Sequence, residues 1–458
     1  MVKNNNISDD KIVFKLKNEN NIDIVGGGPA GLSVGYFAKK EGLEVKIYEA
    51  SGTVGGNCKT IIDGEFRYDS GAHRLHDKSE YVTNEIKLLL GDKLKRVTSP
   101  SKIYYKGTFF NFPISVSDLI YKLDLSLLIK IIYDNILLRL RKRPSPKSFK
   151  QVAYQSYGKT ISKMFLISYT EKLWGDDADN LDPKISGGRL KVLNLRSLMK
   201  DVFAIKKTDS DHLEGAFYYP ELGFGEIFNA LGAKIGPANI FLNKKVCNVY
   251  HDNIKILSFT DNSGENNLVN NLVYTAPIDE LVKSLSPAPP KHILDKLQFI
   301  KYRELMICVI YLDLKKFSSN ASIYFPDSKC PFTRIYEPKN RSTKMSPIEK
   351  TCIVVEVPMG ARNVKISSSK EVVYNKVLDY LENKSLINKE NIINYKLVKI
   401  KSAYPIITLD SIFHIKEIRK YLARFINLKM IGRNSSFEYL HTHNIMERSR
   451  SLINKMVS

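Results

Sequence analysis

The fold is decided by the sequence IDIVGGGPAGLSVGYFAKKEGLEVKIYEA, which occupies residues 22–50. Residues 22–25 are a short apolar run that predicts a buried strand, residues 30–41 carry a helical pattern, and residues 45–48 are again strand-like. A strand, a helix and a second strand in this order indicate a parallel sheet. We therefore predict that the folded part of the chain begins with a parallel βαβ unit.

The turn between the first strand and the helix reads Gly-Gly-Gly-Pro-Ala-Gly and fits the pattern G-x-G-x-x-G. Gly26 permits a tight turn, Gly28 lets the backbone approach a pyrophosphate, and Gly31 allows close contact between helix and strand. The N-terminus of the helix offers free N–H groups and a positive dipole to the anion. Glu49 ends the second strand, where its carboxylate accepts hydrogen bonds from ribose hydroxyls. These features predict a Rossmann-like dinucleotide site; the alternative is a purely structural glycine turn.

A second glycine pair follows the predicted ribose-binding carboxylate. The chain continues from Glu49 as Ala-Ser-Gly-Thr-Val and then Gly55, Gly56 and Asn57. This arrangement resembles the flavoprotein pattern in which a glycine pair lets the loop pass close to FAD, and NAD enzymes usually lack it. We therefore expect FAD as the cofactor, with these three residues beside it, and retain a flexible turn as the alternative.

Several motifs narrow the resemblance within the flavoproteins. Amine oxidases and protoporphyrinogen oxidases usually have an arginine after the glycine pair, where this chain has Asn57. The motifs are GGNCKT (55–60), DSGAHRLHD (69–77), YTEKLWG (169–175) and FTRIYE (332–337). In this order they resemble the UDP-galactopyranose mutase family, in a patchy match that spans roughly residues 21 to 450.

The resemblance implies a specific reaction. The family converts a UDP-hexopyranose into the furanose without net redox change. N5 of the reduced flavin attacks the anomeric carbon, UDP leaves, and the sugar ring opens and recloses. For this chain it implies FAD, a UDP-sugar substrate, NAD(P)H as the reductant and a role in surface polysaccharide synthesis. The protein itself must supply a dry pocket, an aromatic wall and guanidinium groups for the diphosphate.

The resemblance also assigns roles to individual side chains. His73 matches the histidine beside the flavin, and Arg334 and Arg433 match motif arginines, so we expect these three to form the catalytic group. The implied substrate contacts are Trp174, Arg189 on a mobile loop, Tyr404 and Tyr439. For each of them the alternative is a structural role in packing or in a surface ion pair. Glu356 is predicted either to orient an arginine or to face solvent.

The sequence departs from the family near its C-terminal end. After Gly432 and Arg433 the family usually continues to an Asp-Met-Asp element. In this chain His441 and His443 stand where the family has the two aspartates. An acid at this place normally helps to hold the flavin, so we expect His443 beside the cofactor. A changed redox environment, a different sugar or weakened catalysis would follow.

Two further functions stay open on the sequence. The segment YYPELGFGEI (218–227) also suits an FAD oxidoreductase of the amine oxidase and protoporphyrinogen oxidase type. In a third interpretation, the chain binds flavin without being an enzyme. The glycine motif would survive in such a protein, but the arginines and Trp174 would have no reason to converge.

The remaining pattern predicts an α/β protein with intertwined domains. Between about residues 85 and 210 the pattern is mostly helical, and from about residue 217 short β-branched and aromatic runs dominate. We expect a Rossmann-like FAD-binding domain, a helical insertion and an antiparallel β-sheet substrate domain. The predicted segments are 21–100, 211–280 and 396–458 for the FAD-binding domain, 101–210 for the helical insertion and 281–395 for the antiparallel sheet.

Composition limits the class of protein and its partners. The chain has 458 residues, 43% of them hydrophobic and 26% charged, which excludes wholesale disorder and a coiled coil. Its 70 basic and 48 acidic residues give a net charge of +22, which favours anionic partners. No nucleic acid partner is expected. The five cysteines contain no C-x-x-C pair, so we predict neither a metal site nor a disulfide framework, and expect a reducing cytoplasm.

Two stretches bear on membranes. Residues 1–20 lack the apolar core of a signal peptide. Residues 119–143 place apolar side chains at helical spacing and end in a basic cluster, a pattern that also suits an anionic bilayer. Charged residues interrupt the stretch, so a transmembrane helix is not expected. We predict a helix packed inside the second domain rather than a membrane contact, and no particular oligomeric state.

Overall fold

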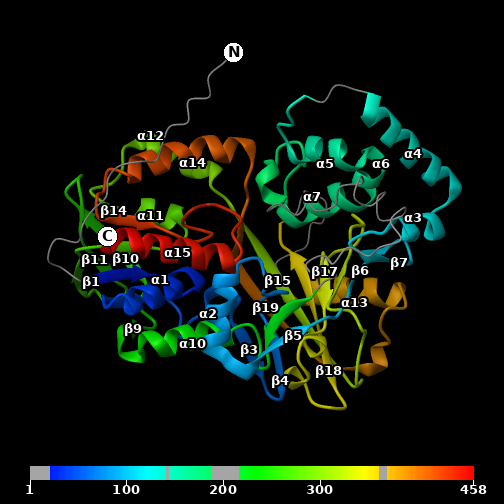
Figure 1. Cartoon of the computed structure of the whole chain (residues 1–458), viewed down its shortest axis with the longest axis horizontal. Coiled ribbons are helices and arrows are strands. Elements are labelled where there is room, and N and C mark those ends of the chain that lie inside the picture. The colour runs from blue at the N-terminus through cyan, green and yellow to red at the C-terminus, as the bar shows by residue number, and fades with distance from the viewer. Residues whose placement is uncertain (1–20, 141–143, 187–215, 361–368) are drawn as a thin grey trace.

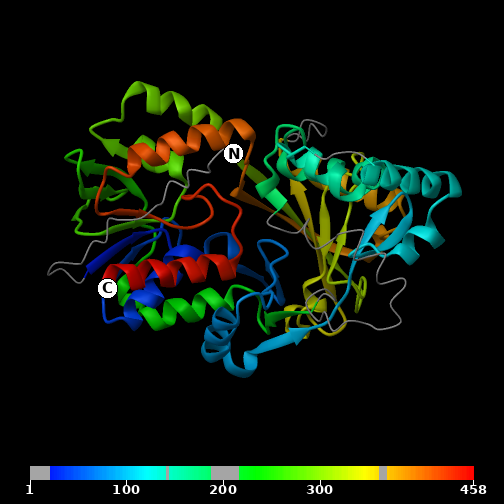
Figure 2. The same cartoon turned by 45° about the horizontal axis from the view of Figure 1, so that its top comes forward.

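The computed structural model describes residues 21–140, 144–186, 216–360 and 369–458. These residues form two regions that lie side by side (Figure 1). One region is a parallel sheet between layers of helices and a small sheet. The other is a long antiparallel sheet with a group of helices at one end, and Figure 2 shows the same two regions from a tilted direction. The predicted α/β fold class is thereby confirmed.

The first region is built on a five-stranded sheet in which every neighbouring pair is parallel. In spatial order the strands are β20 (Leu428–Met430), β13 (Leu272–Tyr274), β1 (Asn21–Val25), β2 (Glu44–Tyr48) and β9 (Ile240–Phe241). One face is covered by the helices α1 (Pro29–Lys40), α2 (Glu80–Leu90), α10 (Glu226–Ile235) and α15 (Thr442–Val457). Apolar side chains of β1 and β2 form one buried cluster with these helices, which explains the near-continuous apolar strands.

The opposite face of the parallel sheet packs on a smaller sheet and further helices. The small sheet has the order β12 (Asn266–Leu268), β11 (Ile256–Asp261), β10 (Val246–His251) and β14 (Leu285–Ser286). The helices on this side are α11 (Ile278–Ser284), α12 (Lys291–Leu294) and α14 (Leu409–Leu422). The parallel sheet is therefore buried on both sides.

The second region is built on a seven-stranded sheet. Its order is β19 (Ile392–Pro405), β15 (Tyr302–Leu312), β18 (Thr351–Pro358), β17 (Arg334–Tyr336), β16 (Ser322–Tyr324), β6 (Ser101–Tyr105) and β7 (Thr108–Phe112). All neighbours are antiparallel except β16 and β6, which are parallel. The helix α13 (Lys370–Asn383) packs on one face. Two ribbons, β3 (Thr60–Asp63) with β4 (Phe66–Asp69) and β5 (Leu94–Val97) with β8 (Phe217–Pro220), lie next to the large sheets.

A group of helices stands at one end of the antiparallel sheet (Figure 1). It comprises α3 (Val116–Lys122), α4 (Leu125–Leu140), α5 (Phe149–Tyr157), α6 (Lys159–Ile161) and α7 (Ser168–Trp174). A π-helical stretch from Ser162 to Ile167 joins α6 to α7. Such stretches are uncommon and often occur at functional sites. Here the stretch leads directly into the YTEKLWG motif.

The structure differs from the sequence prediction in two places. The predicted helical insertion at 101–210 begins with the hairpin of β6 and β7, which belongs to the antiparallel sheet. Its tight turn is formed by Lys106 and Gly107, both with positive φ. The predicted boundary at residue 395 falls inside β19, a continuous strand of 14 residues.

Within the described residues, no helix has both the length and the apolar character needed to cross a bilayer.

Candidate active site

The glycine-rich turn after β1 leaves room for glycine alone at two positions. Gly26 has a φ of 102°, in the left-handed region, and a Cβ built on it would lie 2.4 Å from Oγ1 of Thr275. A Cβ on Gly31 would lie 1.8 Å from the carbonyl oxygen of Gly26. Glycine at both positions therefore allows the turn to pack directly against the start of α1.

Glu49 and the second glycine pair are fastened to this turn. The N–H of Gly27 donates to Oε2 of Glu49 at 2.6 Å, and the N–H of Gly55 donates to the carbonyl oxygen of Gly27 at 2.9 Å. A Cβ on Gly28 would extend into open space whose nearest atom is the Cα of Gly56, 3.8 Å away. The turn, the carboxylate and the glycine pair thus form a cradle that a side chain would fill, and its donors fit a dinucleotide.

Asn57 connects the cofactor loop to the antiparallel sheet. Its side-chain amide donates to the carbonyl oxygens of Lys401 and Ser402, at 3.3 and 3.2 Å. Ser402 has a φ of 48°, an uncommon conformation for a residue with a side chain, at an irregularity in the pairing of β19. The amide of Asn434 donates to the same Ser402 oxygen at 2.9 Å. These two amides stabilise the bend in β19 that precedes Tyr404.

Three aromatic side chains from distant parts of the chain meet in one cluster. Trp174 at the end of α7 lies 5.7 Å from Tyr404 and 5.3 Å from Tyr439, measured between ring centroids. The two tyrosine rings are 5.9 Å apart. Trp174 is buried, whereas both tyrosines are half-buried. The three side chains predicted to form a substrate wall therefore contact one another.

Arg433 packs against this aromatic cluster. Its guanidinium carbon lies 5.0 Å from the ring centroid of Tyr439 and 5.5 Å from that of Tyr404. Its Nε and Nη2 donate to the carbonyl oxygen of Leu440 at 3.1 and 2.7 Å. Within the described part of the chain, no carboxylate forms an ion pair with this guanidinium. Its positive charge is therefore available to an anionic ligand.

Arg334 is held by a carboxylate on the neighbouring strand. Arg334 on β17 lies opposite Glu356 on β18, and its Nε and Nη2 donate to the Glu356 carboxylate at 2.7 to 2.9 Å. The same carboxylate accepts the N–H of Ala72 at 2.8 Å. Burial alone would lower the pKa of Arg334, but the Glu356 charge raises that pKa well above its ordinary value. Glu356 thus orients an arginine, and Nη1 of Arg334 bonds to no described residue.

His73 lies among the arginines. Burial, together with the positive charges of Arg433, Arg341 and Arg334, lowers its pKa from 6.5 to about 3. Its ring stacks on Phe224 with centroids 5.3 Å apart. Its Nδ1 is buried without a hydrogen-bond partner among the described residues. A neutral imidazole with an unused ring nitrogen fits a position beside a bound polar cofactor.

The low pKa of His73 predicts a pH effect on stability. The unfolded chain binds a proton at this residue below about pH 6.5, whereas the folded protein does so only near pH 3, so the unfolding free energy should fall as the pH drops between these values. The variant His73→Asn should show a shallower fall. Urea unfolding at pH 8, 6 and 4.5 measures this slope. At pH 8, the reference, His73 is neutral in both the folded and the unfolded protein. Parallel curves for the two proteins would contradict the assignment.

The two histidines at the position of the family's acids lie at the start of α15. His441 is the residue before the helix, and its N–H donates to the side chain of Asn444 at 3.3 Å. The rings of His441 and His443 stack with centroids 5.7 Å apart, and His441 also meets Tyr439 at 5.3 Å. Burial lowers the pKa of His443. The start of this helix therefore presents imidazole rings, rather than carboxylates, next to the aromatic cluster.

Sequence reasoning missed a buried network behind His73. Asp69 accepts hydrogen bonds from Thr60, Tyr219 and the N–H of Phe224 at 2.5 to 2.9 Å. The fully buried guanidinium of Arg341 lies 3.9 Å from this carboxylate. It also donates to the main-chain oxygen of His73 at 3.0 Å.

One signal for this network was present in the sequence. Asp69 opens the DSGAHRLHD motif, four residues before His73. Nothing in the sequence paired it with Arg341, which lies far along the chain. The network fixes the loop that carries His73.

The structure brings together most of the residues that the sequence singled out. Contacts and shared electrostatic effects connect His73, Trp174, Arg334, Tyr404, Arg433 and Tyr439. The glycine residues and Glu49, which the sequence assigns to FAD binding, lie together in one turn, and Asn57 joins this turn to the antiparallel sheet. Arg189 lies outside the described residues.

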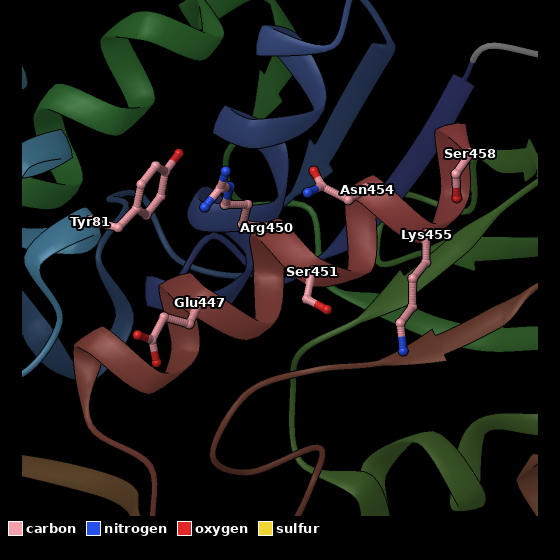
Figure 3. A pocket seen from close by; sticks show the side chains of 7 residues that line it. All are labelled: Tyr81, Glu447, Arg450, Ser451, Asn454, Lys455 and Ser458. Carbon is pink, nitrogen blue, oxygen red and sulfur yellow. The ribbon is translucent and has the colours of Figure 1, made fainter. Parts of the chain in front are cut away.

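A separate surface hollow of about 510 Å³ lies on the solvent side of α15 (Figure 3). Its lining consists of Tyr81, Glu447, Arg450, Ser451, Asn454, Lys455 and Ser458. Arg450 fills part of it by lying 3.8 Å above the ring centroid of Tyr81. The hollow contains none of the predicted site residues.

Comparison with known proteins first identifies the class of fold to which the chain belongs. Residues 24–86 match the family of NAD(P)-binding Rossmann-like domains. A crystal structure of reduced UDP-galactopyranose mutase has the same fold, with a TM-score of 0.83 over 95% of this chain and 94% of that chain at 17% identity. The chain therefore has the same fold as that mutase.

A second family match covers the middle of the chain. Residues 164–384 match the family of UDP-galactopyranose mutase, which confirms the resemblance that the motifs indicated. The dTDP-fucopyranose mutase of Escherichia coli is 26% identical over 234 residues, 48% of this chain and 59% of that protein. The mitochondrial protoporphyrinogen oxidase of Nicotiana tabacum is 27% identical over 169 residues, 35% of this chain and 34% of the oxidase. These curated relatives are thus matched over less than two thirds of their length.

Proposed function

We propose that the protein is an FAD-dependent nucleotide-sugar mutase that interconverts a UDP-hexopyranose and the corresponding UDP-hexofuranose. The observation that carries the proposal is the convergence of Arg433, Arg334 and His73 with the ring cluster of Trp174, Tyr404 and Tyr439. An amine substrate carries no negative charge for paired guanidinium groups to bind, whereas the diphosphate of a nucleotide-sugar does.

FAD fits the glycine cradle. Gly26, Gly28 and Gly31 would let the pyrophosphate approach the N-terminus of α1, Glu49 would accept hydrogen bonds from the ribose, and Gly55 and Gly56 would line the passage toward the flavin. His73 and His443 would lie beside the isoalloxazine. When bound and reduced, the cofactor supplies the nucleophilic nitrogen for the anomeric carbon. NAD(P)H is the proposed reductant.

The side chains of the protein would bind and orient the nucleotide-sugar. Arg433 and the free donor of Arg334 would hold the diphosphate before and after it leaves the sugar. Tyr404 and Tyr439 would donate their hydroxyl groups to phosphate oxygens, and Trp174 would close the wall and exclude water. Arg189 is proposed to close over the nucleotide. The furanose product would serve surface polysaccharide synthesis.

The experiment that tests this function uses the yellow protein under anaerobic conditions. It is incubated with UDP-galactose, and in parallel with dTDP-fucopyranose because the Escherichia coli relative carries that name, with oxidised or reduced flavin. Chromatography should reveal a furanose product only with reduced flavin. Absence of product with every nucleotide-sugar, although FAD is bound and reduced, would contradict the proposal.

A second candidate is an FAD oxidoreductase of the amine oxidase and protoporphyrinogen oxidase type. It is favoured by the match to the tobacco oxidase and by the segment YYPELGFGEI, which forms β8 and the start of α10. Bleaching of the oxidised flavin by an amine or a porphyrinogen, without a sugar product, would select this candidate. FAD binding with neither reaction would indicate a flavin protein without enzymatic activity.

A further inference from the structure

The helices α3 and α4 carry a large apolar surface that nothing described in the chain covers. Six apolar residues of α4 are half or more exposed and lie at spacings of three and four residues, which places them on one stripe of the helix. These residues are Leu125, Ile129, Ile132, Tyr133, Ile136 and Leu140. Ile120 and Tyr121 of α3 extend the surface. We refer to these eight residues as the α3–α4 face.

The opposite side of α4 explains how the helix is held. Leu127, Leu128 and Ile131 pack into the largest buried cluster, so the inner side already satisfies the packing requirement of the helix. Thr160 donates its N–H to Asp134 at 2.6 Å and fastens the helix to α6. The exposed stripe is therefore not needed to attach α4 to the protein. Single exposed apolar residues are normal, but a contiguous set of eight indicates an interaction surface.

Charge favours one occupant for this surface. The sequence from 101 to 163 contains twelve Lys or Arg residues and three Asp residues, a net charge of +9. Lys106 and Lys130 in this part are exposed. Two copies of a chain with a net charge of +22 repel each other, whereas an anionic surface attracts it. A partner with negative charge and an apolar interior therefore matches both properties of the face.

Shape and residue type point the same way. The helix α4 lies at the outer edge of the molecule in both views (Figures 1 and 2). Its 16 residues span about 24 Å along the surface. Tyr121 and Tyr133 combine an apolar ring with a polar hydroxyl, the residue type enriched at the level of lipid headgroups. We propose that the α3–α4 face seats the protein on an anionic lipid bilayer, with α4 lying in the plane of the interface.

This proposal is independent of the catalytic activity and takes up the membrane contact that the sequence leaves as the less favoured alternative for this stretch. The test uses the full-length FAD-bound protein and sedimentation with vesicles. One set of vesicles contains phosphatidylcholine alone, and the other contains phosphatidylcholine mixed with phosphatidylglycerol. The wild-type protein should sediment with the anionic vesicles, and about 0.5 M salt should weaken the binding by screening the charges.

Substitutions on the face provide the decisive comparison. The double variant Ile132→Ser/Ile136→Ser should bind the anionic vesicles at least about tenfold more weakly. It lacks two apolar side chains whose transfer from water into the bilayer stabilises the bound state. The matched control is Leu88→Ser/Ile348→Ser, which replaces two apolar residues that are more exposed than Ile132 and Ile136 and lie on α2 and on the loop before β18. This control should bind like the wild type. Lys130→Glu should weaken binding to anionic vesicles.

Three results would overturn the proposal. The first is a wild-type protein that stays in the supernatant with both kinds of vesicle. The second is equal binding by the wild type and the Ile132→Ser/Ile136→Ser variant. The third is a wild-type dimer in sedimentation equilibrium that this variant converts into a monomer, because the face would then be an interface between two copies. Thermal unfolding should show unchanged stability of all variants, since the replaced side chains are exposed.

Discussion

Replacement of Gly31 by alanine is expected to weaken FAD binding at least about 100-fold and to yield a largely colourless protein. The added Cβ would lie 1.8 Å from the carbonyl oxygen of Gly26, a distance that no pair of heavy atoms tolerates without a covalent bond. The start of α1 must then move away from the turn, and the N–H groups of the first helical turn move with it. A 100-fold loss corresponds to about 2.7 kcal/mol, which is within the usual cost of overpacking a tight site.

The measurement is the FAD content after purification, followed by titration of the apoprotein with FAD. The matched control is Gly232→Ala in α10, where the new Cβ would meet its nearest neighbour at an ordinary 3.5 Å. This control should retain FAD and gain about 0.4–1 kcal/mol of stability, because alanine reduces the entropy of the unfolded chain. Full FAD content in Gly31→Ala would show that the turn does not form the cofactor site.

The first βαβ unit could be predicted from the sequence because all of its determinants are local. The glycine spacing, the apolar strands and Glu49 lie within residues 22–50, and the turn, helix and strands each require only neighbouring residues. The parallel register of β1 and β2 follows from the same unit. The motif order also indicated which arginines and aromatic residues meet, since the resemblance supplied the contacts that a single sequence does not contain.

The elements and contacts that the sequence did not predict depend on pairing between distant segments of the chain. The hairpin of β6 and β7 was assigned to a helical insertion, although Lys106 and Gly107 between alternating apolar residues are a hairpin signal. Its place in the sheet rests on parallel pairing with β16, about 220 residues later. The sequence leaves Glu356 either orienting an arginine or facing solvent, and only the register of β17 and β18 shows that it orients Arg334. For the same reason no sequence pattern joined Arg341 to the loop of His73.

The buried pair of Arg334 and Glu356 allows stability and substrate binding to be separated. The variant Arg334→Met should lower the unfolding free energy by about 3–5 kcal/mol, because it leaves the nearly inaccessible carboxylate of Glu356 without its counter-charge. The same variant should bind UDP at least about 1.5 kcal/mol more weakly if a charge-assisted contact to phosphate is lost. Urea unfolding and calorimetric titration with UDP measure the two effects.

The double variant Arg334→Met/Glu356→Gln distinguishes the two roles of the arginine. Glutamine at 356 is neutral and its amide oxygen still accepts the N–H of Ala72, so no charge is left buried. The unfolding free energy should then recover to within about 1–2 kcal/mol of the wild type. UDP binding should stay as weak as in Arg334→Met, because the guanidinium is still missing. Recovery of both properties together would mean that Arg334 serves only the fold, and the diphosphate site would then rest on Arg433 alone.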